Sequence, residues 1–89
     1  MSADEINQWL GTFMVCGSDK KRLHLTQKTL DDEIAYHFRA VSHNGAPAII
    51  TPYGFLSITI NDGLPNGCLM VIDEMEPELA CANSVFMDD

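Results

Sequence analysis

The apolar residues of this chain change their spacing along its length, from a helical period near the N-terminus to a strand period after Pro47. One helical face is marked at positions i, i+3, i+4 and i+7 by Ile6, Trp9, Leu10 and Phe13. Later segments alternate apolar and polar residues, as half-buried strands do. Separate helical and strand segments predict an α+β domain in which helices pack on one face of a sheet.

The first helix has a clear start signal. Ser2 and Glu5 have the spacing of a capping box, in which each side chain bonds a backbone amide that the helix leaves without a partner. Gly17 then follows as a residue suited to a left-handed C-cap at the end of this helix. The sequence therefore predicts a helix from about Ala3 to Cys16.

Residues 29–43 permit two interpretations. In the first, Thr29 caps a helix, a stripe at spacings of four, four and three lies along it, and Asn44-Gly45 ends it. The stripe consists of Leu30, Ile34, Phe38 and Val41. In the second, the segment from Ile34 is a strand, Asn44-Gly45 is a hairpin turn, and Pro47 lies early in the returning strand. We favour the helix.

The remaining segments are short. Leu23 to Thr26 predicts a brief strand, and three further strands follow at Ala48–Thr51, Leu56–Ile60 and Cys68–Ile72. The last two are expected to pair as a hairpin across a turn-rich connection. A helix from Asp73 onwards is a further option, because a helical face would include Met75, Leu79, Ala82 and Phe86.

Residues 1–89 therefore predict a single compact α+β domain. An N-terminal amphipathic helix and a second helix would pack on one face of a small, mainly antiparallel sheet of three or four strands, with room for a short C-terminal helix. The hydrophobic fraction of 46% and the charged fraction of 20% are those of a folded globular chain.

Most of the formal net charge of −8 lies in the C-terminal half, because residues 40–89 contain no lysine and no arginine. A field of one sign attracts basic partners and repels polyanions. The only basic cluster, Lys20-Lys21-Arg22, is too small for strong counterion release. The composition therefore argues against direct nucleic-acid binding and favours a protein partner with a basic surface.

Catalytic and metal-binding motifs are absent from the sequence. His37 and His43 lack the i, i+4 spacing of a helical zinc pair, no cysteines form a C-x-x-C, and no G-x-S-x-G is present. We therefore expect no enzyme activity, no metal and no cofactor. Cys16, Cys68 and Cys81 are an odd, widely spaced set, which favours reduced thiols over a disulfide framework. A Cys68–Cys81 bridge stays open as an alternative.

The location of the protein is predicted from its N-terminus and its apolar runs. No basic leader precedes an apolar run, and the longest apolar stretch, Cys68 to Ile72, is far shorter than a membrane span. We expect a cytoplasmic protein that does not insert into membranes.

The densest acidic segment is the candidate binding site. Four carboxylates fall within six residues, at Asp73, Glu74, Glu76 and Glu78. Met75 and Tyr53 are the apolar anchors that we expect beside them. The ordinary alternative is a solvated loop. The functional hypothesis is a small non-enzymatic protein that modulates or inhibits a partner, of the inhibitor, immunity or anti-defence type, with carboxylates that mimic nucleic-acid phosphates.

A structural role is the alternative hypothesis. The chain would then form a homo-oligomer through a helix face or a sheet edge. The strands Ala48–Thr51 and Cys68–Ile72 contain no lysine to discourage edge-to-edge pairing.

Overall fold

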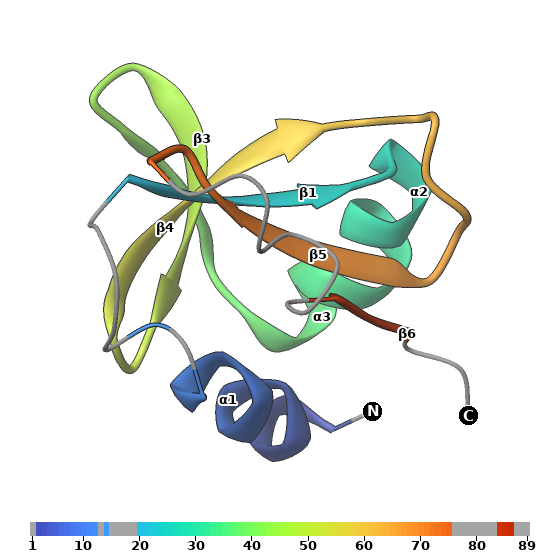
Figure 1. The fold of residues 1–89 in the computed structure, drawn as a ribbon, viewed down its shortest axis with the longest axis horizontal. Coiled ribbons are helices and arrows are strands. Elements are labelled where there is room, and N and C mark those ends of the chain that lie inside the picture. The colour runs from blue at the N-terminus through green and yellow to red at the C-terminus, as the bar shows by residue number, and fades with distance from the viewer. Residues whose placement is uncertain (1, 13, 15–19, 76–83, 87–89) are drawn as a thin grey trace.

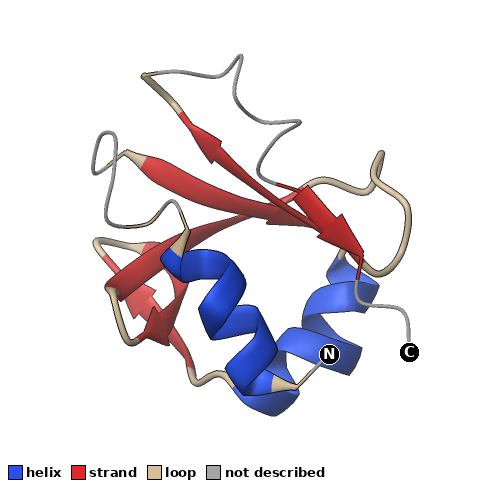
Figure 2. Cartoon of the chain, turned by 60° about the horizontal axis from the view of Figure 1, so that its bottom comes forward, coloured by secondary structure: helices blue, strands red, loops and turns tan. Residues whose placement is uncertain are grey.

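The computed structural model shows a six-stranded mixed sheet with helices on one of its faces (Figures 1 and 2). It describes residues 2–12, 14, 20–75 and 84–86. The elements are α1 (Ala3–Gly11), β1 (Lys21–Leu25), α2 (Gln27–Thr29), the π-helical turn η1 (Leu30–Ile34), α3 (Ala35–His37), β2 (Ala40–His43), β3 (Ala46–Thr51), β4 (Gly54–Ile60), β5 (Cys68–Asp73) and β6 (Ser84–Phe86). The α+β class is confirmed, whereas the expected three or four strands were too few.

The start of α1 is the one predicted from the sequence. The Ser2 hydroxyl accepts from the Glu5 amide at 3.2 Å, and the Glu5 carboxylate accepts from the Ser2 amide at 3.2 Å. The helix ends at Gly11, and the Thr12 hydroxyl donates to the Trp9 carbonyl at 2.7 Å. Glycine and threonine are weak helix formers, so the helix is shorter than predicted. The predicted end near Cys16 lies outside the described residues.

The segment after β1 combines both sequence interpretations. Its helical part, residues 27–37, is formed by α2, η1 and α3 and is capped by Thr26 rather than Thr29. Beyond it the chain becomes the strand β2. Asn44 and Gly45 both have positive φ, 54° and 78°, and form the two-residue turn to β3. Only turns of this hand match the twist of a hairpin, so the turn signal prevails over the helical stripe.

The expected hairpin of β4 with β5 is wrong. The strand order is β2-β3-β4-β1-β5-β6, so β1 lies between them, parallel to β4 and antiparallel to β5. Residues 61–67 cross the end of β1 and are fixed to the start of the second helix (residues 27–37). The Thr26 hydroxyl donates to the Asn66 side chain at 2.9 Å, and the Gly67 amide donates to the Thr29 hydroxyl at 2.9 Å.

The expected helix after Asp73 is also wrong at the residues that the structure describes. Asp73 is the last residue of β5, and residues 84–86 form β6, which pairs antiparallel with β5. Val85 packs against the core opposite Leu69, so the alternation of a strand prevails over the helical spacing of Phe86. Residues 76–83 lie outside the description.

The core lies between the sheet and the helices. The sheet contributes residues of its four interior strands, which are Leu23, Leu25, Ile49, Leu56, Ile58, Leu69 and Val71. The helices contribute Ile6, Leu10 and Ile34, and Phe38 follows directly after α3. Both helices lie on this side of the sheet (Figure 2). The opposite face, named here the open face, carries the other alternate residues of the same strands.

No helix within the described ranges is long and apolar enough to cross a membrane.

Candidate functional site

Two of the predicted acidic contacts take part in interactions within the fold. Asp73 is only 4% exposed, and its carboxylate accepts from the Met75 amide at 2.9 Å. Glu74 is exposed, and its carboxylate accepts from Arg22 Nε at 2.6 Å. Asp73 therefore stabilises the end of β5 and is not exposed for contact with a partner, and the charge of Glu74 is offset by Arg22.

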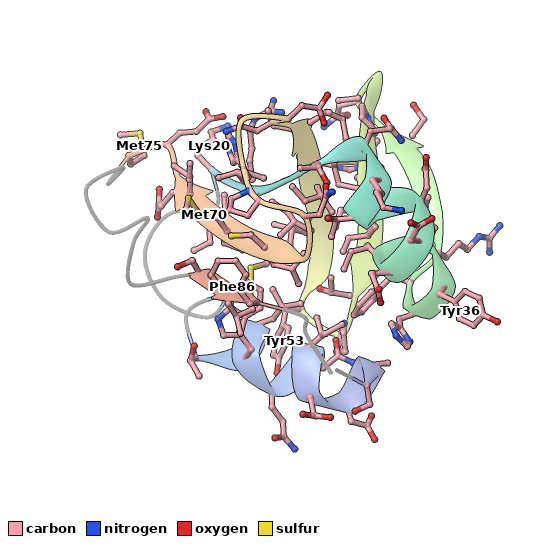
Figure 3. The ribbon with its side chains drawn as sticks, turned by 90° about the vertical axis from the view of Figure 1, so that its right-hand side faces the viewer. Lys20, Tyr36, Tyr53, Met70, Met75 and Phe86 are labelled. Atoms are coloured by element: carbon pink, nitrogen blue, oxygen red, sulfur yellow. The ribbon has the colours of Figure 1, made fainter. Side chains whose placement is uncertain are left out.

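The predicted anchors lie far apart. Met75 is 69% exposed beside the end of β5, whereas Tyr53 lies beside α1 and donates to the Asn7 carbonyl at 3.3 Å. Figure 3 shows these two side chains in separate regions. Glu76 and Glu78 lie outside the described residues. The described members of the predicted site therefore do not form one surface.

The two strands that were expected to offer free edges are interior strands. β3 lies between β2 and β4, and β5 lies between β1 and β6. The outer strands of the described sheet are β2 and β6. The sheet-edge hypothesis therefore loses the strands on which it was based.

A second acidic surface lies on the helix of residues 27–37. We name it the helix surface, and it consists of Asp31, Asp32, Glu33 and Tyr36. Tyr36 is 86% exposed and projects away from the body of the molecule (Figure 3). Lys28 pairs with Asp32 at 2.6 Å, an exposed bridge that adds little to stability. The helix surface thus carries three carboxylates and one exposed aromatic ring on the same short helical segment, with one lysine beside them.

The open face contains a cleft of about 410 Å³. We name it the open-face cleft, and its lining residues are Lys20, Lys21, Arg22, His43, Asn44, Ala46, Phe55, Ser57 and Glu74. The start of β1, the end of β5 and the β2–β3 hairpin meet there, at the left of Figure 1. The cleft therefore joins segments from the two halves of the sheet.

The pairing of β1 explains the basic side of the cleft. Arg22 pairs with Ser57 of β4 on one side and with Ile72 of β5 on the other, and the Glu74 amide donates to the Lys20 carbonyl at 2.8 Å. Arg22 also donates through Nη1 to the Thr59 hydroxyl at 3.2 Å. These two side-chain bonds fix the guanidinium in position at the floor of the open face.

The opposite wall of the cleft is aromatic. The rings of His43 and Phe55 are stacked, with centroids 4.2 Å apart and planes 11° apart. The sequence interpretation did not single out Phe55. A signal was available, because Phe55 is two residues before Ser57 and so shares the wet face of β4.

His24 lies on the open face of β1, next to Arg22 along the strand. Its Nδ1 is buried and has no hydrogen-bond partner among the residues that the structure describes. Burial lowers the pKa of His24, as does the nearby Arg22 charge, while Glu74 acts in the opposite direction. The neutral imidazole is therefore favoured in the folded state.

Among the described residues, no group of three or more histidines, cysteines, aspartates or glutamates could hold a metal ion. Cys68 has a buried free thiol, and burial raises its pKa. Cys16 and Cys81, and with them the alternative Cys68–Cys81 bridge, lie outside the described residues.

No protein-family model, no curated protein and no solved structure matches this chain. The functional proposals below therefore rest on the geometry of the described surfaces.

Proposed function

We propose that this is a small, non-enzymatic interaction protein that binds a basic surface of a partner protein. The helix surface is the principal contact. The partner class is a nucleic-acid-handling protein, because such proteins carry basic grooves that an anionic surface can occupy. Binding there would inhibit the partner. The proposal places the protein in the cytoplasm, where buried thiols such as Cys68 stay reduced.

The observation that carries the proposal is the exposure of Tyr36. A ring that is 86% exposed contributes almost no burial to the fold. Tyrosine is enriched at binding hot spots, where a partner removes the ring from water. The carboxylates of the helix surface supply the charge that steers a basic partner towards it.

The π-helical turn is consistent with this role. η1 contains Asp31, Asp32 and Glu33, and π-helical turns inside α-helices are frequent at functional sites. Ile34 and Phe38 on the same segment are buried, so the helix is fixed to the core while its acidic side faces solvent.

The test is affinity capture from lysate at low and at roughly physiological salt, with the captured proteins quantified by mass spectrometry. Tyr36→Ala should reduce capture of a basic protein by about 30-fold, the effect of losing a hot-spot tyrosine worth about 2 kcal/mol. Asp31→Lys should also reduce capture, and should weaken its dependence on salt.

Asp4→Lys is the matched control, because it makes the same charge change near the start of α1. It should leave capture unchanged. If Asp4→Lys reduced capture as much as Asp31→Lys, net charge alone would explain binding and the helix surface would be rejected. If Tyr53→Ala or Met75→Ala abolished capture while Tyr36→Ala did not, the contact would lie where the sequence predicted it.

A further inference from the structure

The open-face cleft gathers positive charge in an acidic protein. The chain contains five lysines and arginines, and three of them, Lys20, Lys21 and Arg22, line this one cleft. Glu74 is the one carboxylate among the lining residues. The cleft is thus a local basic site on a chain of net charge −8, opposite in sign to the helix surface.

The basic side chains have the geometry of an anion site. Arg22 is fixed by Glu74 through Nε and by Thr59 through Nη1, and among the described residues its Nη2 has no hydrogen-bond acceptor. A guanidinium that is fixed in advance loses little side-chain entropy when it binds an anion. Phosphate oxygens accept from such a fork and from the ammonium groups of lysines.

The aromatic wall has the geometry of a stacking platform. Phe55 is 52% exposed even though His43 is stacked on it, so its ring has surface left for another ring. Stacking of a base on an aromatic side chain contributes about 1–3 kcal/mol. Asn44 and Ser57 line the same cleft and provide amide and hydroxyl groups for the edges of a bound ring.

Size and charge select a small ligand. The volume of about 410 Å³ lies in the range of small-molecule sites. A long polyanion would meet the repulsion of the whole acidic chain and would gain only a few basic contacts. A ligand with one or two phosphates gains the local contacts and meets less of that repulsion.

We infer that the open-face cleft binds a nucleotide of one or two phosphates, with its base on Phe55 and its phosphate on Lys20 and Arg22. This site is separate from the helix surface, and it does not depend on the proposed protein partner.

The experiment is an NMR titration of the full chain with AMP, GMP, UMP and ADP. Adenosine, inorganic phosphate and a single-stranded oligonucleotide are titrated in parallel. Nucleotides should shift the amide resonances of the cleft residues and bind more tightly than adenosine or phosphate alone. Phe55→Leu should weaken nucleotide binding by about tenfold, as expected for loss of a stacked ring. Lys20→Gln should weaken the binding of the nucleotides and of phosphate. It should leave the binding of adenosine unchanged.

Two variants serve as matched controls. Phe86→Leu removes an exposed ring from β6, and Lys28→Gln removes an exposed positive charge from the second helix. Both should bind nucleotides like the wild type. Amide spectra confirm that each variant is folded.

Three outcomes would overturn the inference. One is the absence of shifts at roughly 5 mM nucleotide, a concentration that reveals even weak specific sites. Another is phosphate binding as tight as nucleotide binding, which would show an anion site only. The third is tighter binding of the oligonucleotide, which would identify a nucleic-acid surface. None of these outcomes bears on capture of a partner through Tyr36.

Discussion

His24 and Asp73 are polar side chains of the sheet that differ in their hydrogen bonding. Asp73 is buried, and its carboxylate accepts a hydrogen bond from a backbone amide. His24 has a buried ring nitrogen for which the described part of the chain offers no hydrogen-bond partner. A buried polar group with a partner stabilises the fold, whereas a buried donor without one costs the full desolvation penalty. The two residues therefore give separate predictions.

The lowered pKa of His24 predicts a loss of stability in mild acid. Above its ordinary pKa of 6.5, His24 is neutral in both the folded and the unfolded states. As the pH falls below that value, the unfolded chain binds the proton first, so the free energy of unfolding decreases until the lower, folded pKa is reached. Urea unfolding at about pH 7.5 and pH 5.5 measures this decrease. His24→Gln should show a smaller decrease than the wild type.

The other titrating groups are the same in both proteins, so their effects cancel in this comparison. Equal decreases in the two proteins would show that protonation of His24 is not linked to folding.

Replacement of Asp73 should affect folding and leave binding by the folded protein unchanged. Asp73→Ala removes the acceptor of the Met75 amide and should lower the free energy of unfolding by about 1–3 kcal/mol. Glu74→Ala is the neighbouring comparison and should cost less than about 1 kcal/mol, because its bridge to Arg22 is exposed. Chemical denaturation measures both. If the Asp73→Ala protein were as stable as the wild type but captured no partner, Asp73 would instead belong to the binding site.

At the scale of elements, α1 and the β3–β4 turn meet at a close contact. Tyr53 of the turn reaches across to α1, and a Cβ added at Gly11 would lie 2.5 Å from the Tyr53 hydroxyl oxygen. Cβ atoms in proteins essentially never lie this close to another atom, so the tyrosine side chain must move if Gly11 is replaced. Tyr53 is 42% exposed, which makes such movement feasible.

This contact predicts a non-additive pair of substitutions. Gly11→Ala should gain up to about 1 kcal/mol of stability in a Tyr53→Ala background, because alanine favours the helix. In the wild type the clash should cancel or reverse that gain. A double-mutant cycle by urea unfolding should give a coupling of at least about 0.5 kcal/mol. Additive effects would show that Tyr53 moves away without cost.

Local signals predicted local elements, and they failed where pairing depends on distant segments. The Ser2–Glu5 capping box lies within one helical turn and located the start of α1 correctly. The alternation of Leu56, Ile58 and Ile60 identified β4 in the same way. The insertion of β1 between β4 and β5 depends on bonds between residues 61–67 and the second helix. No periodicity within a single segment encodes such bonds.

The candidate site shows the same limit. The acidic run from Asp73 is dense in the sequence, yet Asp73 forms part of the interior in the fold. The open-face cleft shows the reverse case. Lys20, His43 and Phe55 are far apart in the chain and come together only in the folded sheet. The sequence drew attention to the acidic run but not to Phe55, and topology decided which residues lie together.

For the whole molecule, the net charge of −8 predicts that salt stabilises the fold. Like charges repel one another in the compact state, and salt screens that repulsion. The urea midpoint should rise as NaCl increases from about 20 to 200 mM, over which the Debye length shortens roughly threefold. A midpoint that fell would show that the Arg22–Glu74 and Lys28–Asp32 pairs contribute more than the net repulsion.

The central position of β1 has a consequence for synthesis on the ribosome. β1 is made before the second helix and before β2 and β3, yet both of its neighbours, β4 and β5, are made after them. The nascent β1 therefore has no strand to pair with until the β2–β3–β4 meander has formed from its local contacts. Its apolar residues Leu23 and Leu25 stay unburied until that meander offers an edge. During translation, this strand is the segment that a chaperone would have most reason to hold.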